Sequence, residues 1–127
     1  MSTTTTRGIR IVAQPRFLEA ESKPEANRYV FAYDITITNV GTTGAKLDSR
    51  HWIITNANGD AENVRGPGVV GEQPYLAPGE SFEYTSFCPL DTPVGTMEGS
   101  FQMVDDTGEH FDAEIAPFRL SLPGAVN

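Results

Sequence analysis

One segment of this sequence, Arg65–Pro74, has the spacing of a chemical motif. Its glycines match the pattern G-x-G-x-x-G and are Gly66, Gly68 and Gly71. In dinucleotide-binding proteins this pattern follows a strand and opens a helix, whose N-terminal amides hold a pyrophosphate. Here the residues Glu72-Gln73-Pro74 follow, and no helix is predicted to begin there, so we reject the dinucleotide interpretation. Two interpretations stay open: the loop amides bind an anion beside Arg65, or the glycines provide positive φ and close backbone approach.

The same segment has an apolar part. Val69 and Val70 are adjacent β-branched residues in a loop, and both cannot easily point inward, so we expect at least one to be exposed between Pro67 and Pro74. An apolar patch with a proline rim is typical of a protein-interaction surface. The alternative is that the loop folds over the end of the domain and buries both valines. The candidate binding residues are Arg65, Gly66, Gly68, Val69, Val70, Gly71, Gln73 and Pro74.

A second segment, Asp105 to Glu114, concentrates carboxylates and an imidazole. Its weak candidates for metal ligands are Asp105, His110 and Asp112, because magnesium takes carboxylate oxygens and cobalt also accepts imidazole. Neighbours on one face of a strand lie roughly 7 Å apart, however, which is farther than the ligands of one ion normally sit. The pattern favours a solvated hairpin tip, and we assign no metal site.

No pattern in the sequence predicts catalysis. His51 precedes the only tryptophan, Trp52, and no serine or cysteine has the context of a nucleophile elbow, so no triad can be proposed. The single cysteine, Cys88, excludes an intramolecular disulfide and a cysteine-based zinc site. We expect Cys88 to pack as a small hydrophobic residue. We therefore expect neither an enzyme nor a cofactor.

Alternation of apolar and polar residues predicts strands along most of the chain. The clearest is 28–40, and further strands are predicted at 9–14, 45–55, 61–64, 81–87, 96–104 and 109–115, with Pro117 interrupting the end before a short edge segment at 118–120. Asn58-Gly59 predicts a type I′ hairpin turn, because both residues tolerate positive φ. Asp105 to Gly108 predicts a second hairpin turn. No window combines helical periodicity with caps, so we predict an all-β antiparallel sandwich of about seven or eight strands, with Trp52 in its core.

Length and charge limit the remaining possibilities. The 127 residues are enough for one domain, which we place at 8–122 between a disordered polar tail at 1–7 and a C-terminal tail at 123–127. The formal net charge of -8 disfavours nucleic acid and anionic lipid. No apolar run approaches the roughly 20 residues that span a bilayer, and the N-terminus lacks the apolar core of a signal peptide. We expect a soluble cytoplasmic protein without membrane insertion, and unpaired edge strands leave a weak homodimer open.

A series of motifs from about Ile9 to Leu120 closely resembles the bacterial ApaG (CorD) family. In order they are Arg28-Tyr-Val-Phe-Ala-Tyr33, Ile35-Thr-Ile-Thr-Asn39, Trp52-Ile-Ile-Thr-Asn56, Gly68-Val-Val-Gly71, Gln73-Pro74, Ala77-Pro78-Gly79-Glu80, Tyr84-Thr-Ser86, Gly95-Thr-Met97-x-Gly99 and Phe118-Arg-Leu120. The resemblance implies a fibronectin type III-like or immunoglobulin-like sandwich. It also implies an association with cobalt tolerance and magnesium efflux, and a gene neighbour that encodes a diadenosine tetraphosphate hydrolase.

Similar domains in eukaryotic F-box proteins and in a DNA-polymerase-interacting protein look like protein-binding modules. Two residues depart from the family pattern: Pro67 replaces a residue that is commonly acidic, and Phe87 replaces a usual glycine. Pro67 removes a backbone donor, which counts against an anion cradle. We therefore expect a non-enzymatic module that binds an unknown protein partner through the loop 65–74. The alternative is a small-ligand sensor that binds a divalent cation or a nucleotide polyphosphate or pyrophosphate through the glycine-rich loop.

Overall fold

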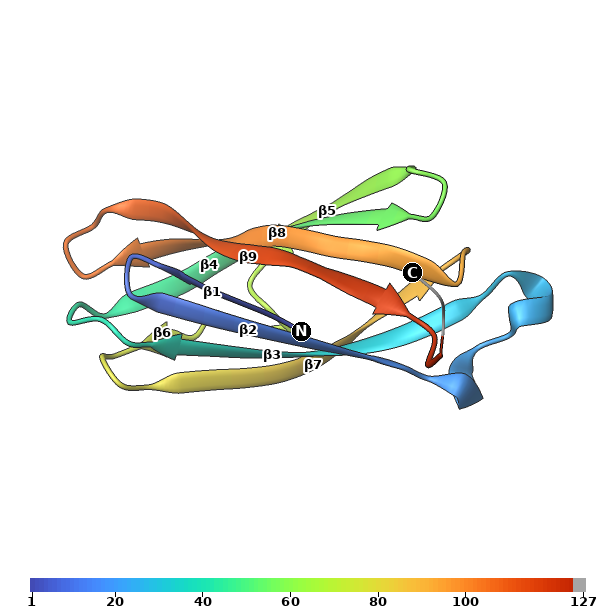
Figure 1. The fold of residues 1–127 in the computed structure, drawn as a ribbon. Helices are drawn as coiled ribbons and strands as arrows, with labels where there is room; N and C mark the ends of the chain where they lie inside the picture. The colour runs from blue at the N-terminus through green and yellow to red at the C-terminus, as the bar shows by residue number, and fades with distance from the viewer. Residues whose placement is uncertain (125–127) are drawn as a thin grey trace.

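The computed structural model describes residues 1–124 and is built almost entirely from antiparallel strands (Figure 1). The strands are β1 (Ser2–Thr6), β2 (Ile9–Phe17), β3 (Tyr29–Asn39), β4 (Ala45–Asn56), β5 (Ala61–Pro67), β6 (Tyr75–Leu76), β7 (Ser81–Leu90), β8 (Val94–Asp105) and β9 (His110–Ser121). Two short 3-10 turns, Glu19–Glu21 and Pro24–Ala26, connect β2 to β3. Within residues 1–124 no helix is long and apolar enough to cross a membrane.

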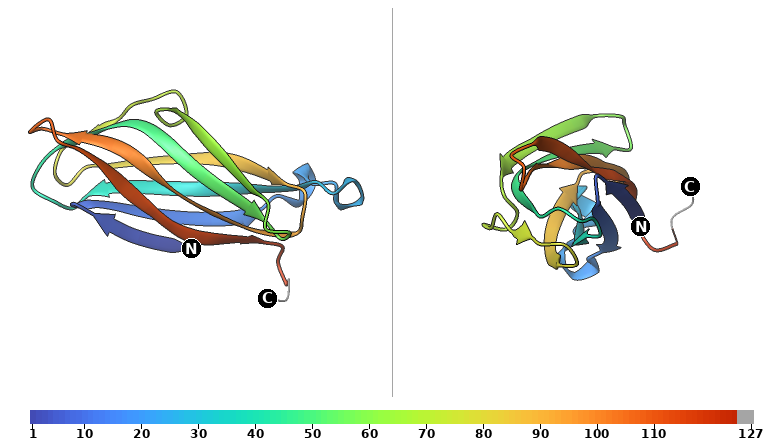
Figure 2. Two further views of the ribbon diagram at one scale, coloured as in Figure 1. Left: turned by 90° about the horizontal axis from the view of Figure 1, so that it is seen from above. Right: turned by 90° about the vertical axis from the view of Figure 1, so that its left-hand side faces the viewer.

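The strands form two sheets that face each other (Figure 2). One sheet has the order β1-β2-β3-β7, and the other has the order β5-β4-β8-β9, with the two-residue β6 paired to the start of β4. The prediction of an all-β antiparallel sandwich is confirmed. Two of its short strands, β1 and β6, were not indicated by the sequence pattern.

The core lies between the inner faces of the two sheets. Phe31, Ile35 and Ile37 of β3 are buried on one side of it, as the alternation in that strand predicts. Trp52 is 2% exposed at the centre of β4, and its ring packs edge-on against Phe118 with 5.9 Å between the ring centroids. The predicted core position of Trp52 is therefore confirmed. Burial of a large apolar side chain in this core contributes about 1.5–3 kcal/mol to the stability of the fold.

The prediction of a disordered tail at 1–7 is wrong. Residues 2–6 form β1, which pairs with β2 in the register Ser2↔Ala13. The reason is a turn at Arg7-Gly8, where both residues have positive φ, 49° and 81°, as a type I′ hairpin turn requires. The β-branched threonines of β1 then suit a strand. Of the predicted tail at 123–127, residues 125–127 lie outside the described part of the chain.

Strand β1 also joins the two sheets on one side of the sandwich. The hydroxyl of Ser2 donates to the carbonyl of Ala116 in β9 over 2.9 Å, and the amide of Glu114 donates to the hydroxyl of Thr6 over 3.1 Å. On the opposite side the outer strands are β5 and β7, and no ladder joins them within residues 1–124. The sandwich is therefore closed at β1–β9 and open between β5 and β7.

Both predicted hairpin turns occur, but the turn at Asn58-Gly59 is not type I′. Only Gly59 has positive φ, 84°, and its amide donates to the carbonyl of Asn56 over 3.1 Å. The side chain of Asn56 accepts bonds from the amides of Asn58 and Asp60, which selects a longer loop with one left-handed residue. Asp105 and Gly108 build the same arrangement between β8 and β9.

The sequence predicted that Pro117 interrupts the last strand, and this prediction is wrong. Strand β9 runs through it because the register with β8 shifts there: Gly99 pairs with Ile115, and Met97 pairs with Phe118. A bulge leaves one residue outside the ladder, so it tolerates a residue without an amide hydrogen. The shift also explains why Ile115 and Phe118 are both buried although three positions separate them.

Candidate functional site

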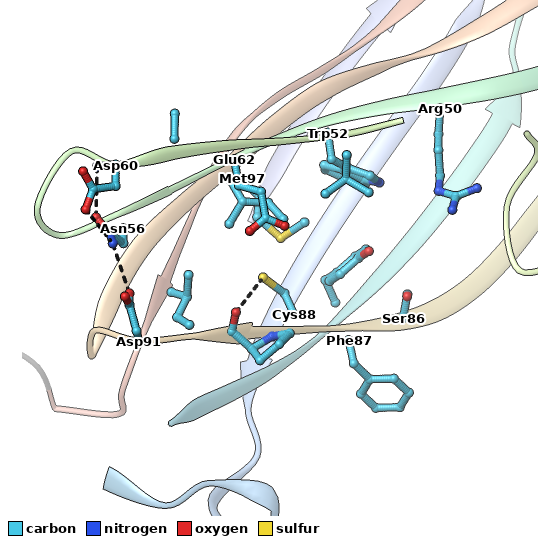
Figure 3. Close-up of a pocket in the computed structure, with 16 residues that line it drawn as sticks. Arg50, Trp52, Asn56, Asp60, Glu62, Ser86, Phe87, Cys88, Asp91 and Met97 are labelled. Atoms are coloured by element: carbon cyan, nitrogen blue, oxygen red, sulfur yellow. Dashed lines mark hydrogen bonds between the residues drawn. The ribbon is translucent and has the colours of Figure 1, made fainter. Parts of the chain in front are cut away.

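The open side of the sandwich has two adjoining cavities, which we call the open-side groove. The larger has a volume of about 710 Å³ and lies between β4, β5 and β7 (Figure 3). The smaller, of about 330 Å³, lies where the loop 68–74 leaves β5. Four residues line both cavities, which makes the groove continuous: they are Tyr33, Arg50, Trp52 and Ser86.

The loop after β5 forms a tight turn at one end of this groove. The amide of Val69 donates to the carbonyl of Glu72 over 2.8 Å, and the amide of Glu72 donates back to Val69 over 2.9 Å. Between them Val70 and Gly71 have φ of 44° and 82°, so the type I′ geometry expected at Asn58-Gly59 occurs here instead. Val69 is 1% exposed and Val70 is 54% exposed. The expectation that one of these valines is exposed is confirmed, and the alternative that both are buried is wrong.

Val70 has a strained backbone. A β-branched residue with φ of 44° is an outlier, because its side chain crowds the backbone in the left-handed region. Such a conformation costs on the order of 1–3 kcal/mol and persists only where the surrounding bonds impose it. The two Val69–Glu72 bonds impose it here, and they hold an exposed apolar side chain at the end of the groove. Strain of this kind is concentrated at binding and switch sites.

Each glycine of the motif has a conformational or steric role. A Cβ on Gly66 would lie 2.9 Å from Nη2 of Arg50, and a Cβ on Gly68 would collide with the carbonyl oxygen of Glu72. Gly68 and Gly71 also have positive φ, 57° and 82°. These observations support the interpretation in which the glycines allow positive φ and close approach.

The loop amides are partly used within the chain. The amide of Gly68 donates to the carbonyl of Asp48 over 2.8 Å, and that of Val69 donates to Glu72. Within residues 1–124, the amides of Val70 and Gly71 have no protein acceptor. Anion binding by this loop stays a prediction, and the amides of Val70 and Gly71 are the donors available to bind an anion.

The other residues predicted for the site have different positions. Arg65 pairs with His51 in the ladder between β5 and β4, on the face opposite Trp52, so it does not reach the groove. Gln73 donates from Nε2 to the carbonyl of Asp48 over 2.9 Å, and the carbonyl of Pro74 accepts from the amide of Leu47. Gln73 and Pro74 therefore hold the loop to the bulged start of β4.

Sequence reasoning missed the most important side chain of the groove, Arg50. It projects from the inner face of β4, two residues before the buried Trp52, where an apolar side chain is usual. Its Nη1 donates to the carbonyls of Pro67 and Gly68 over 2.8 and 2.9 Å. Within residues 1–124, Nε and Nη2 have no protein acceptor, and Arg50 forms no salt bridge. The sequence signal that could have identified Arg50 was its position two residues before Trp52, on the face of the strand that was predicted to be buried.

Two tyrosines lie close to Arg50 in the smaller cavity. The hydroxyl of Tyr84 is buried and has no hydrogen-bond partner among residues 1–124. Burial raises the pKa of Tyr84 strongly, and the positive charge of Arg50 opposes part of that rise. Burial also raises the pKa of Tyr33. Both hydroxyls are therefore neutral hydrogen-bond donors at pH 7.

The far end of the larger cavity is acidic (Figure 3). Asn56 donates from Nδ2 to Asp91 over 3.0 Å and contacts Asp60 at 3.5 Å, and Glu62 lines the same wall. Cys88 is buried beside it, and burial raises the pKa of its thiol to about 11. A thiol with that pKa is protonated at pH 7 and unreactive, which agrees with the predicted packing role.

Phe87 has a different environment from its neighbours in β7. It is 62% exposed, and its ring points away from the cavity that Cys88 faces (Figure 3). The ring of Phe87 therefore lies on the outer face of the sheet.

The weak metal candidates are not brought together. The carboxylate of Asp105 accepts bonds from Thr107 and from the amide of Glu109, and these bonds, with the charge of Arg7, lower its pKa. His110 and Asp112 are exposed on the outer face of β9. In the part of the chain that the structure describes, no three His, Cys, Asp or Glu side chains are placed to hold one ion.

Comparison with known proteins identifies the family. The family model described as the ApaG domain matches residues 19–105. The chain is 52% identical to Protein ApaG of Anaeromyxobacter dehalogenans over 127 residues, which covers all of both chains. It is 55% identical to Protein ApaG of Pseudomonas putida over 112 residues, covering 88% of this chain and 89% of the relative.

Solved structures agree with the sequence comparison. A crystal structure from Bordetella pertussis that carries the name ApaA is 49% identical, with a TM-score of 0.90, and the match covers 92% of this chain and 95% of that one. The C-terminal domain of wzt, at 11% identity and a TM-score of 0.56, shares the fold alone. The chain therefore belongs to the ApaG family.

Proposed function

We propose that this protein is a non-enzymatic binding module that docks an extended segment of a protein partner along the open-side groove. The loop 68–74 forms one end of the contact surface, where Val70 is held exposed in a strained turn. That combination of strain and exposure is the observation that carries the proposal. The relatives share the family name ApaG, which denotes no reaction, in keeping with a binding role.

The open side supports docking of a segment for a second reason. β5 and β7 are the outer strands of their sheets, and each has backbone groups along its outer edge that no strand of residues 1–124 pairs with. An extended peptide can add to such an edge through main-chain bonds, while alternate side chains enter the groove. Pro89 in β7 removes one donor and limits pairing with further copies of the chain.

A photo-crosslinking amino acid at position 70 tests the proposal in cells. The matched control is position 40, because Val40 is 49% exposed and does not line the groove. We expect a discrete crosslinked partner from position 70 and none from position 40. The purified partner is then expected to bind Val70→Ser more weakly than Val40→Ser. Equal crosslinking from both positions, or none from position 70, would contradict the proposal.

A small-ligand sensor is the second candidate function, and one observation favours it. The Nε and Nη2 donors of Arg50 have no acceptor among residues 1–124 and are suited to an anion such as a nucleotide polyphosphate. Amide chemical shifts recorded during addition of magnesium, cobalt, ATP and diadenosine tetraphosphate test it. Saturable shifts at 66–71 would indicate a phosphate ligand, and shifts at 105–114 would indicate a cation.

For either function we propose the cytoplasm as the compartment. Cys88 is a free, buried thiol, and free thiols are usual where the surroundings are reducing.

A further inference from the structure

We infer that Arg50 anchors a carboxylate subsite in the open-side groove, and that the docked segment supplies an aspartate or glutamate side chain to it. The inference rests on the proposed function, because it names the chemistry of the segment that the groove binds. It concerns a residue outside the glycine motif, on the inner face of β4.

The guanidinium of Arg50 is held in a fixed orientation. Nη1 donates to two carbonyls of the loop, those of Pro67 and Gly68. Gly66 lies opposite Arg50 in the ladder and has no side chain, so the guanidinium can lie against its backbone. Arginine presents its donors in a planar fork that matches the two oxygens of a carboxylate. With Nη1 occupied, the edge formed by Nε and Nη2 remains for a ligand.

Tyr84 supplies a second donor to the same cavity. The side chain of Tyr84 lines the smaller cavity together with Arg50, and its hydroxyl is buried without a partner among residues 1–124. An orphan hydroxyl weakens the free protein, since a buried donor normally has an acceptor. A carboxylate bound at Arg50 would accept from this hydroxyl. The two features, a half-buried arginine without a salt bridge and a buried hydroxyl without an acceptor, thus point to one anionic ligand group.

The charges around the groove favour a single carboxylate over a polyphosphate. Besides Arg50, the larger cavity is lined by three carboxylates, those of Asp60, Glu62 and Asp91. The whole chain has a formal net charge of -8. A ligand with several negative charges would be repelled by this surface, whereas one charge can be neutralised by Arg50.

The shape of the groove favours a peptide segment as the source of the carboxylate. From Arg50 to Asn56, β4 extends along the groove for roughly 20 Å, which is the length of about six extended residues. Between these ends the lining is largely apolar and includes Trp52, Ile54 and Met97. A segment with one acidic residue and apolar neighbours would fit both parts.

The test is a titration of the labelled full-length protein with end-capped hexapeptide pools. The pools have random apolar residues around a fixed Glu or a fixed Gln. The probe is the Nε–Hε signal of Arg50, and the exposed Arg119 serves as the control signal. We expect the Glu pool to shift the Arg50 signal at concentrations about tenfold or more below those of the Gln pool, the equivalent of ~1.4 kcal/mol. The Arg119 signal is expected to stay in place.

Two variants assign the effect to the subsite. Tyr84→Phe keeps the ring and is expected to weaken binding of the Glu pool several-fold without changing binding of the Gln pool. Arg50→Gln is expected to abolish the preference for Glu. Because Arg50 also holds the loop, the amide spectrum of Arg50→Gln must first show the native pattern. If that spectrum is not native, the test of the subsite rests on Tyr84→Phe.

Each contrary outcome has a distinct meaning. Equal binding of both pools in the groove would overturn the carboxylate inference and leave the proposed binding function in place. If neither pool binds while N-acetylglycine shifts the Arg50 signal, the carboxylate comes from a small molecule, which overturns the segment as its source. A stronger response to inorganic phosphate than to the Glu pool, or no response of Arg50 to any probe, would also overturn the inference.

Discussion

Replacement of Tyr84 by phenylalanine is expected to stabilise the protein, although such a change usually removes a hydrogen bond and destabilises. The hydroxyl of Tyr84 is buried without a partner among residues 1–124, while its ring packs against Phe82 and Phe101. An unsatisfied buried polar group costs about 1–3 kcal/mol. Tyr84→Phe removes that cost and keeps the ring contacts, so we expect the free energy of unfolding to rise by about 1 kcal/mol. For a domain of this size that corresponds to about 4 °C in melting temperature.

Urea denaturation and thermal melting of the purified protein both measure this change. The control is Tyr75→Phe, because the hydroxyl of Tyr75 is exposed and donates to the carboxylate of Asp106. We expect the control to leave stability unchanged or slightly lower. If Tyr84→Phe instead lowers the unfolding free energy by 1 kcal/mol or more, the Tyr84 hydroxyl has a partner in the free protein. The inference that the Tyr84 hydroxyl is an unpaired donor available to a ligand would then be refuted.

Three further outcomes are expected from the geometry of the site. Val70→Asn should raise stability by about 1 kcal/mol because asparagine tolerates positive φ, whereas Val40→Asn should not; equal urea midpoints for the two variants would contradict the strain argument. Gly68→Ala should lower stability by about 2–3 kcal/mol, and Gly59→Ala by about 1 kcal/mol. Both glycines have positive φ, but only Gly68 lacks space for a Cβ. The reverse order of the two variants in thermal melts would be inconsistent with the loop geometry. The raised pKa of Cys88, about 11 against 9.0, means that the folded state holds its proton where the unfolded state releases it. Stability should therefore fall as pH rises from 9 to 11, and Cys88→Ala should fall less steeply over that window in urea titrations at each pH; parallel curves would refute the contribution of the thiol.

The proposed function depends on Val70, which the composition of the loop indicated, and on Arg50, which sequence reasoning missed. Val70 is exposed because its neighbours, Val69 and Glu72, bond to each other, and Arg50 is oriented by carbonyls that lie 17 and 18 residues further along the chain. A sequence motif describes only neighbours, so the glycines of 66–71 stood out, although their roles are conformational and steric. Arg50, which has the chemistry for a ligand, did not.

Local physical rules were enough to predict most of the architecture. Side chains of a strand alternate between its faces, so Phe31, Ile35 and Ile37 could be assigned to one buried face, and Trp52 to the core, without knowledge of any partner strand. Asparagine, aspartate and glycine mark turns through their own backbone preferences, so both hairpins at 56–60 and 105–109 were found. The resemblance to the ApaG family rested on motifs in these strands and in the loops at 68–74 and 77–80.

Other features were decided only by contacts between distant residues. The polar segment Ser2–Thr6 is a strand because β2 and β9 provide partners for it, and Pro117 fits within β9 because β8 accommodates a bulge. The open-side groove exists because one side of the sandwich is joined by β1 and β9 while β5 and β7 remain apart. Strand pairing and cavity shape depend on which segments meet in space, and no pattern along the chain contains that information. The sequence alone therefore determined most of the strands and the positions of the two hairpins, and the tertiary structure decided that an arginine, a tyrosine and a strained valine line the same cavity.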